Sequence, residues 1–294
     1  MYALIMRTAV VAILLSVGVL AAQQAPPPSP KLPDGVTLEP NISYDQHPET
    51  KVDVFKPAGW SATGKPKYPG ILVIHGGGWT GGTKESMVER WVLPYVEKGF
   101  VAVNVEYRLA KAAKAPAAVE DVLKAADWFR EHYKQYNVDG GRVAVTGGSA
   151  GGHLALMVGM TPKKAKLGKP ANMAAVINFY GITDVGDQLQ GPNMRTYAVT
   201  WVPEQEGRFA LADRVSPKTY VRRGLPPVLT LHGDKDQTVP YEHGTKITKA
   251  LRDAGNDAEL ITVTDGRHGF PPEKMKELQV RIFEFLTKRG IIKQ

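Results

Sequence analysis

The sequence predicts an α/β protein built on a mainly parallel sheet, and two observations carry this prediction. Short apolar runs of strand length recur along the chain, end in Gly-rich turns and mostly lack alternation between apolar and polar residues. Such unbroken apolar strands are typical of parallel sheets covered on both faces. Between them lie segments with helical periodicity, and strands that alternate with helices imply crossover connections. We therefore expect helices on both faces of one sheet.

The predicted strands fall into two groups. The first two are expected to form an N-terminal antiparallel pair at residues 37–44 and 51–55. The others are the unbroken apolar runs, at residues 71–74, 101–105, 142–145, 175–179, 227–231 and 259–263. Because helical segments separate these later runs, they are expected to lie parallel to one another.

Helices are predicted between the strands. Apolar residues recur at three-to-four spacing from Val119 to Tyr133 and from Met275 to Leu286, which is the spacing of one helix face. Ser86 and Glu89 form a capping-box pattern, so another helix should begin there. Pro94 should kink or end that helix early.

The N-terminus is expected to be a targeting segment at residues 1–22. Arg7 precedes a short apolar run that ends in Ala21 and Ala22, which is the pattern of a secretory signal peptide. The run is shorter than the roughly 20 residues that a membrane-spanning helix needs. We therefore expect cleavage near Ala22, no stable membrane anchor afterwards, and a periplasmic or secreted protein.

The rest of the chain is expected to hold a linker and one domain. Residues 23–35 include a Pro-rich stretch that favours an extended spacer, and the domain covers residues 36–294. Within it, residues 181–225 are polar, contain proline and are only weakly periodic. So long a connection inside a compact domain is usually a lid or a binding insertion. We interpret it as a small cap.

Composition and charge exclude several classes of protein. The 294 residues are 43% hydrophobic and 22% charged, which is ordinary for soluble globular proteins. The absence of Cys excludes a disulfide framework, a Cys-ligated metal site, a Cys nucleophile and a lipid-anchored N-terminus. The net charge is +8, but no nucleic-acid-binding motif accompanies it. The seven His are scattered without metal-ligand spacing, so neither a metal nor a cofactor is predicted.

A candidate nucleophile lies in the Gly147–Gly151 motif, which has the form G-x-S-x-G. The motif follows the strand at 142–145 and precedes an apolar helix expected from Ala150 to Met160. In this setting the serine sits on a sharp strand-to-helix turn with its hydroxyl exposed. Ser149 is therefore the predicted nucleophile. Alone, the motif is weak, because Gly-rich turns between strands and helices are common.

A second motif supports the first. Residues 75–79 read His-Gly-Gly-Gly-Trp and end the strand at 71–74. Glycines there leave backbone N–H groups free to point at a developing oxyanion. The predicted oxyanion-hole donors are Gly77, Gly78 and, after the nucleophile, Ala150. A phosphate-binding loop would need a Lys-Ser/Thr pair or a G-x-G-x-x-G pattern, and neither is present.

An acid and a histidine follow the serine in sequence. Asp234 and Asp236 follow the strand at 227–231, and His268 follows the strand at 259–263. Because loops after parallel strands leave the same edge of the sheet, these groups can converge on Ser149. His268 can take the serine proton only if a carboxylate holds its other nitrogen. Both aspartates are candidates for that role.

Together these motifs resemble the α/β-hydrolase esterases. The segments that carry the resemblance are residues 75–79, 147–153, 234–240 and 267–270, and the similarity runs from about Val54 to Leu286. It is greatest to bacterial hormone-sensitive-lipase-like and to acetyl-xylan or feruloyl esterase-like enzymes. In that pattern the acid is the Asp before x-x-Val-Pro, which is Asp236. Relatives of hormone-sensitive lipase usually have Asp where this chain has Gly148, which favours the polysaccharide- or small-ester branch.

The resemblance implies an α/β-hydrolase fold and an exported serine carboxylic-ester hydrolase that needs no cofactor. Its substrate would be a small or polysaccharide-linked ester, with Ser149, Asp236 and His268 as the catalytic triad. One alternative is an amidase or peptidase of the prolyl-oligopeptidase kind, which would share the triad but generally carries a large propeller domain. A second is a non-catalytic binding module, although such modules usually lose a triad member. The oligomeric state is not predicted.

Four aromatic residues are candidates for substrate contacts. Trp79 adjoins the oxyanion loop and would line the acyl pocket. Tyr180 follows the strand at 175–179, and Tyr197 and Trp201 lie in the predicted cap; any of these three could stack on a sugar or an aromatic ring. The alternative for all four is packing under or inside the cap.

Overall fold

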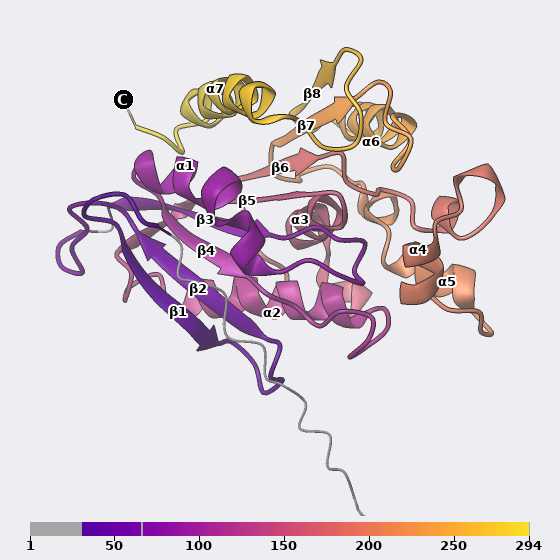
Figure 1. Ribbon diagram of the computed structural model, residues 1–294, viewed down its shortest axis with the longest axis horizontal. Helices are drawn as coiled ribbons and strands as arrows, with labels where there is room; N and C mark the ends of the chain where they lie inside the picture. Colours follow the sequence, from indigo (N-terminus) through magenta and orange to yellow (C-terminus); the bar gives the residue numbers. More distant parts are fainter. Residues whose placement is uncertain (1–30, 66, 294) are drawn as a thin grey trace, which may run out of the picture.

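Eight strands form one sheet in the computed structural model, which describes residues 31–65 and 67–293 (Figure 1). They are β1 (Thr37–Ser43), β2 (Lys51–Lys56), β3 (Tyr68–Ile74), β4 (Val101–Val105), β5 (Val138–Gly148), β6 (Ala175–Phe179), β7 (Val228–Gly233) and β8 (Ala258–Val263). Their order across the sheet is β1-β2-β4-β3-β5-β6-β7-β8. β2 pairs antiparallel with β1 and β4, and all later pairs are parallel. The predicted α/β architecture is confirmed.

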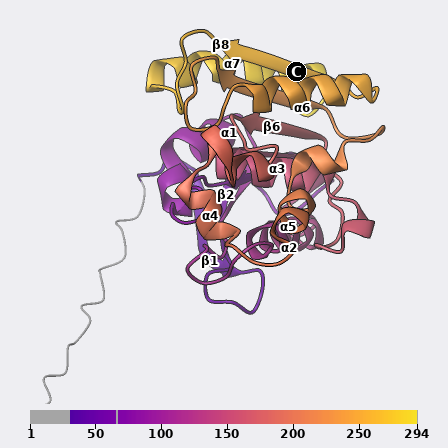
Figure 2. The same cartoon turned by 90° about the vertical axis from the view of Figure 1, so that its right-hand side faces the viewer.

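Helices cover both faces of this sheet (Figures 1 and 2). They are α1 (Leu93–Glu97), α2 (Ala117–Glu131), α3 (Ala150–Met160), α4 (Thr196–Trp201), α5 (Arg208–Arg214), α6 (Glu242–Asp253) and α7 (Pro272–Lys288). Apolar side chains of α2, α3 and α6 share one buried cluster with one face of the sheet, and those of α1 and α7 share a second cluster with the other face. The sheet is therefore buried between two helical layers, as its unbroken apolar strands require.

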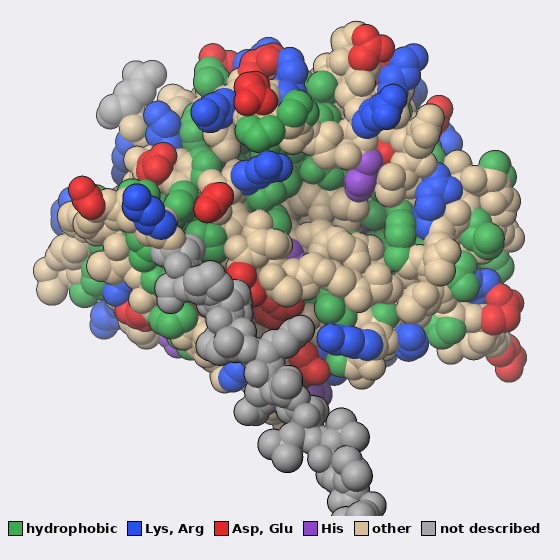
Figure 3. Space-filling view, viewed as in Figure 1, with side chains coloured by type: hydrophobic (Ala, Val, Ile, Leu, Met, Phe, Trp, Pro, Cys, Tyr) green, Lys and Arg blue, Asp and Glu red, His purple; other side chains and the backbone are tan. Residues whose placement is uncertain are grey.

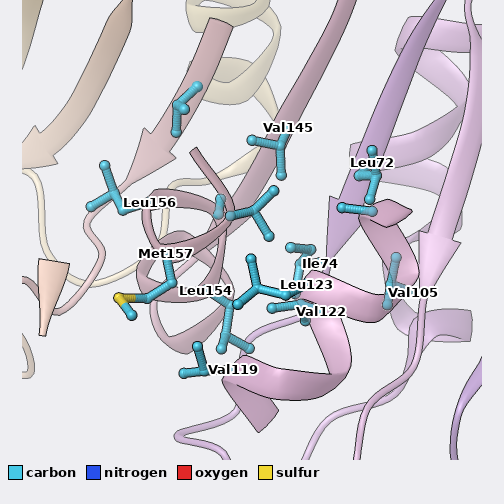
Figure 4. Packing of buried hydrophobic residues seen from close by; sticks show 14 of the residues in the cluster. Leu72, Ile74, Val105, Val119, Val122, Leu123, Val145, Leu154, Leu156 and Met157 are labelled. Carbon is cyan, nitrogen blue, oxygen red and sulfur yellow. The ribbon is translucent and has the colours of Figure 1, made fainter. Parts of the chain in front are cut away.

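Helix α3 lies at the centre of the core. All of its side chains are buried, and Figure 4 shows Leu154 of α3 beside Val122 and Leu123 of α2. Its residues are apolar on nearly every side of the helix, which is typical of a helix surrounded by protein. The element that begins directly after Ser149 is thus also the most enclosed helix of the fold.

The segment after β3 differs from the prediction. A 3₁₀ turn covers Lys84–Met87, a π-helical turn covers Val88–Val92, and α1 begins only at Leu93. The capping box is wrong, because Ser86 Oγ donates to the Thr83 carbonyl (2.6 Å) inside the first turn and caps no helix. Pro94 falls in the first turn of α1, where a proline costs no hydrogen bond.

Helix α6 was not predicted, although a signal for it exists. Ile247 and Leu251 lie four residues apart and are buried, with His243 one turn earlier on the same side, while most of the helix is polar. A narrow buried stripe of this kind is typical of a surface helix.

Residues 181–225, the predicted cap, connect β6 to β7. The segment holds α4, α5 and three 3₁₀ turns, at Gly186–Gln188, Gly191–Asn193 and Pro217–Tyr220. In Figure 1 α4 and α5 lie close together to the right of the sheet. The predicted signal peptide at residues 1–22 and most of the predicted linker at 23–35 lie outside the described residues.

The face of the molecule seen in Figure 3 carries charges of both signs. Lys and Arg side chains are interspersed there with Asp and Glu. No helix in the described part of the chain is both long and apolar enough to span a membrane.

Candidate active site

Ser149 occupies a strained turn between β5 and α3. Its backbone angles are φ 58° and ψ −123°, a region that residues with a side chain rarely adopt. The Ser149 amide donates to the Phe179 carbonyl on β6 (2.9 Å), which fixes the turn to the neighbouring strand. This is the strand–turn–helix geometry that exposes a serine hydroxyl at the end of a parallel sheet.

The structure brings the three predicted triad residues into one hydrogen-bonded chain. Ser149 Oγ lies 3.0 Å from His268 Nε2, and His268 Nδ1 lies 2.8 Å from Asp236 Oδ2. The three side chains come from the loops after β5, β8 and β7. Between the two candidate acids, Asp236 is the one that contacts the imidazole, as the resemblance implied.

Asp236 is held ionised by its neighbours. Burial alone would raise the pKa of this carboxyl, but hydrogen bonds from His232 and His268 hold the pKa well below its usual range. The amides of Thr238 and Val239 add donors to Oδ1, at 2.8 and 3.0 Å. An ionised Asp236 accepts the Nδ1 proton of His268, so the Nε2 that faces Ser149 is free to accept the hydroxyl proton.

The predicted oxyanion loop has backbone angles that glycine adopts readily and other residues rarely do. Gly77 and Gly78 have φ values of 109° and 58°, and within residues 67–293 neither amide donates a hydrogen bond to backbone or side chain. Both residues line the same cleft as Ser149. Ala150 is the first residue of α3, so its N–H has no acceptor inside the helix. Three free amides therefore border the nucleophile.

The four aromatic candidates occupy two different environments. Tyr180 and Tyr197 line the cleft, and the ring centroid of Tyr180 lies 4.7 Å from that of His268. Trp79 and Trp201 are fully buried and stacked on each other, with centroids 4.2 Å apart. The predicted substrate contact is wrong for these two indoles because both are fully buried and neither lines the cleft.

Sequence reasoning missed three residues of the cleft. A volume of about 430 Å³ above Ser149 is bounded by the side chains of Met87, Trp91 and Thr238 as well as by those of Tyr180 and Tyr197. Thr238 lies within the acid motif and could have been found there. Met87 and Trp91 come from the 3₁₀ and π-helical turns after β3, and their positions depend on packing that no local pattern reveals.

Trp91 and Tyr180 also explain the residue before the nucleophile. A Cβ on Gly148 would lie 2.9 Å from the Trp91 ring and 3.2 Å from the Tyr180 hydroxyl. A larger side chain at this position would have to displace the indole. The glycine at position 148, where the lipase-like pattern has Asp, therefore leaves room for the Trp91 and Tyr180 side chains that line the cleft.

No metal site accompanies this arrangement in the part of the chain that the structure describes, where no group of three or more His, Asp and Glu could hold an ion.

Known proteins resemble this chain over most of its length. The protein family BD-FAE matches residues 52–251, which include Ser149 and Asp236 and end before His268. Esterase LipQ of Mycobacterium tuberculosis is 30% identical over 64% of this chain and 47% of its own. The probable carboxylic ester hydrolase LipM of the same organism is 29% identical over 72% of this chain and 51% of its own. The chain thus spans about half the length of these curated relatives.

The solved structures show the fold over nearly the whole chain. The apo form of Thermogutta terrifontis esterase 2 is 26% identical, has a TM-score of 0.73, and aligns over 90% of this chain and 98% of its own. The same protein has been solved with butyrate bound and phosphorylated by paraoxon. Because the family match covers most of the domain and the fold agrees, the chain belongs to the BD-FAE family, within the α/β-hydrolase esterases.

Proposed function

We propose that this protein hydrolyses small carboxylic esters through a covalent acyl-enzyme on Ser149. The observation that carries the proposal is the chain of hydrogen bonds from Asp236 through His268 to the Ser149 hydroxyl. The esterase names of the relatives support the same reaction class.

The geometry supports a two-step reaction. Ser149 Oγ attacks the ester carbonyl carbon as its proton passes to His268 Nε2, and the tetrahedral oxyanion then collapses and expels the alcohol, which takes that proton. In the second step water attacks the acyl-enzyme while His268 accepts its proton. The carboxylic acid leaves, and the proton returns to Ser149 Oγ.

The amides of Gly77, Gly78 and Ala150 are proposed to hold the oxyanion. They carry partial positive charge where the negative charge develops, and they need no reorganisation as it forms. Ala150 also lies at the positive end of the α3 dipole. Loss of one such donor typically lowers kcat by about 10²–10³-fold.

The cleft favours esters with small acyl or aromatic groups. Its volume of about 430 Å³ is bounded by Trp91, Tyr180 and Tyr197, which offer rings rather than charges. The butyrate found in Thermogutta terrifontis esterase 2 is a short carboxylate of fitting size. Carbohydrate-linked esters belong to the same proposal, with the sugar on the open side of the cleft.

Turnover of p-nitrophenyl acetate tests the reaction class. We expect the wild type to hydrolyse it and Ser149→Ala to lose nearly all activity, while the matched control Ser43→Ala on β1 retains it. Near wild-type activity of Ser149→Ala would contradict the assignment. Peptide p-nitroanilides, tested alongside, should be much poorer substrates than p-nitrophenyl esters; the reverse preference would favour a peptidase or amidase.

We also propose that the chain is exported and cleaved near Ala22, because residues 1–22 have the pattern of a signal peptide. Mass spectrometry of the protein from periplasmic and culture fractions should find a chain that begins near Gln23. An uncleaved chain confined to the cytoplasm would contradict export.

A further inference from the structure

His153 is a buried histidine outside the triad, and both of its ring nitrogens have partners. It lies on α3 one turn after Ser149, where its amide donates to the Ser149 carbonyl (2.9 Å). Its Nδ1 lies 3.1 Å from Trp79 Nε1, and its Nε2 lies 2.6 Å from the Val215 carbonyl oxygen. One side chain thus joins the nucleophile helix to the residue after the oxyanion glycines and to the cap.

The partners fix the form of the ring. An indole N–H can only donate and a carbonyl can only accept, so His153 must carry its proton on Nε2 and leave Nδ1 bare. Burial lowers the pKa of His153 to about 4, against the opposing effect of the Val215 carbonyl. The imidazole is therefore neutral at ordinary pH, and it accepts from Trp79 while it donates to Val215.

Trp79 needs such a partner because its backbone is strained. It has a φ of 58° and directly follows Gly77 and Gly78, which also have positive φ. For a bulky side chain this is an outlier, and it persists only where surrounding contacts hold it. The Trp79 indole is held by the His153 hydrogen bond, by the Trp201 stack and by a tilted contact with Tyr197 at 5.9 Å.

We propose that His153 is a positioning residue for the oxyanion hole: by accepting the Trp79 indole N–H, it locks the strained loop 77–79 at a fixed place relative to Ser149. The proposal rests on the proposed ester hydrolysis. Because the Trp79 φ of 58° is held through the indole, relaxation of the Trp79 backbone after loss of that contact would move the adjoining Gly77 and Gly78 amides away from the oxyanion. His153 touches neither substrate nor reacting atoms, and it acts through Trp79.

Two substitutions at position 153 separate a positioning role from a packing role. His153→Asn keeps an acceptor close to the place of Nδ1, and His153→Leu fills the site without one. We expect His153→Leu to lower kcat for p-nitrophenyl acetate by about 10- to 100-fold with little change in KM, because misplacement of about 1 Å costs this much. His153→Asn should stay within about fivefold of the wild type, since the acceptor is restored.

A double-mutant cycle with Trp79→Phe tests the shared hydrogen bond. Phe keeps an aromatic ring but lacks the indole N–H and is smaller, so it should lower kcat at least as much as His153→Leu. Since both changes break one contact, the double variant should lose no more than about twofold beyond the larger single loss. Losses that multiply in the double variant would overturn the proposal, as would a change confined to KM.

A matched histidine provides the control. His132, which directly follows α2, contacts an indole as well: its ring stacks on that of Trp128 (4.2 Å between centroids) but lies outside the cleft. His132→Leu should leave kcat unchanged, and circular dichroism should show every variant folded. If folded His153→Leu and Trp79→Phe keep wild-type kcat, this inference fails and the proposed hydrolysis stands. If the wild type hydrolyses no ester, the proposed function fails and takes this inference with it.

Discussion

Asp236 has both carboxylate oxygens occupied, and this decides how His268 is oriented. Oδ1 accepts the amides of Thr238 and Val239, and Oδ2 faces His268 Nδ1. Two amide donors on one oxygen prevent the carboxylate from rotating, so the imidazole keeps the tautomer that the reaction requires. Asp236 is thus held by its own loop and in turn holds the His268 imidazole in one orientation.

The amide analogue of this residue gives the first prediction. Asp236→Asn keeps the size of the side chain but can donate to His268 Nδ1 and stabilise the wrong tautomer. We expect kcat to fall by roughly 10²–10⁴-fold with KM nearly unchanged. Steady-state kinetics with p-nitrophenyl acetate measure this, and Asp234→Asn is the matched control. Equal losses in both variants would contradict the assignment of the acid.

Burial of His153 predicts a pH-dependent stability. Its pKa lies at about 4 in the folded protein, below the ordinary 6.5, so between these values the unfolded chain binds a proton that the folded one does not. Stability is therefore intact above pH 6.5 and falls as the pH drops toward 4, by up to about 3 kcal/mol from this residue. Urea unfolding at about pH 7 and about pH 4.5 should show a smaller decrease in His153→Asn than in the wild type. An equal decrease would count against the buried neutral ring.

Among the elements, the loop after β3 depends most on its glycines. A Cβ on Gly77 would lie 2.1 Å from the Gly81 carbonyl oxygen, whereas a Cβ on Gly81 would meet nothing closer than 4.0 Å. Both residues lie in one loop, but only Gly77 has a positive φ. Alanine substitutions at Gly77 and Gly81 therefore distinguish the effect of the Gly77 backbone geometry from a general effect of adding a side chain to this loop.

We expect Gly77→Ala to lower kcat by about 10²-fold or more, because the loop must shift away from the nucleophile. Gly81→Ala should remain near the wild type. Hydrolysis of p-nitrophenyl acetate by both purified variants measures the difference. Comparable kcat values for the two would argue against an oxyanion hole in this loop.

The π-helical turn at Val88–Val92 places Trp91 against Gly148, and so it limits the cleft. Trp91→Ala should enlarge the cleft and favour hydrolysis of esters with long acyl chains over those with short ones. The reason is that each additional buried methylene contributes about 0.8 kcal/mol. The measured quantity is the ratio of kcat/KM for p-nitrophenyl octanoate to that for the acetate, which should rise about tenfold. An unchanged ratio would exclude Trp91 from the acyl pocket.

The elements differ in how much of them the sequence predicts. The apolar strands and the Gly147–Gly151 turn could be recognised because their residues are required locally, by burial on both faces and by a sharp turn. The segment at 84–97 could not, because packing on the sheet overrides the capping pattern at Ser86. The stacking of Trp79 on Trp201 joins residues more than a hundred positions apart. No local pattern encodes such a contact, so the sequence alone suggests substrate contacts for both indoles.

At the scale of the whole molecule, the segment 181–225 contacts the oxyanion loop, the nucleophile helix and the acid loop. Trp201 stacks on Trp79 after the oxyanion glycines, and the Val215 carbonyl accepts from His153 on the nucleophile helix. Arg195 Nε donates to the Thr238 carbonyl in the acid loop (3.0 Å). These contacts hold residues 181–225 against the elements that form the site.

The core beneath the site predicts a linked loss of stability. Leu154 is fully buried on α3 between the sheet and α2, so Leu154→Ala should reduce the free energy of unfolding by about 2–5 kcal/mol. Val280 on α7 is 57% exposed, and Val280→Ala should change it by less than about 0.5 kcal/mol. Urea denaturation of both variants measures this. Similar values would contradict the central position of α3.

The central claim is that three loops at one edge of the sheet deliver an activated serine, and covalent labelling tests it most directly. A fluorophosphonate probe, followed by peptide mass spectrometry, should modify Ser149 in the folded wild type. Labelling should be absent in Ser149→Ala and strongly slowed in His268→Ala, which removes the base. Modification of another residue, or ester hydrolysis that persists while Ser149 stays unlabelled, would contradict the account.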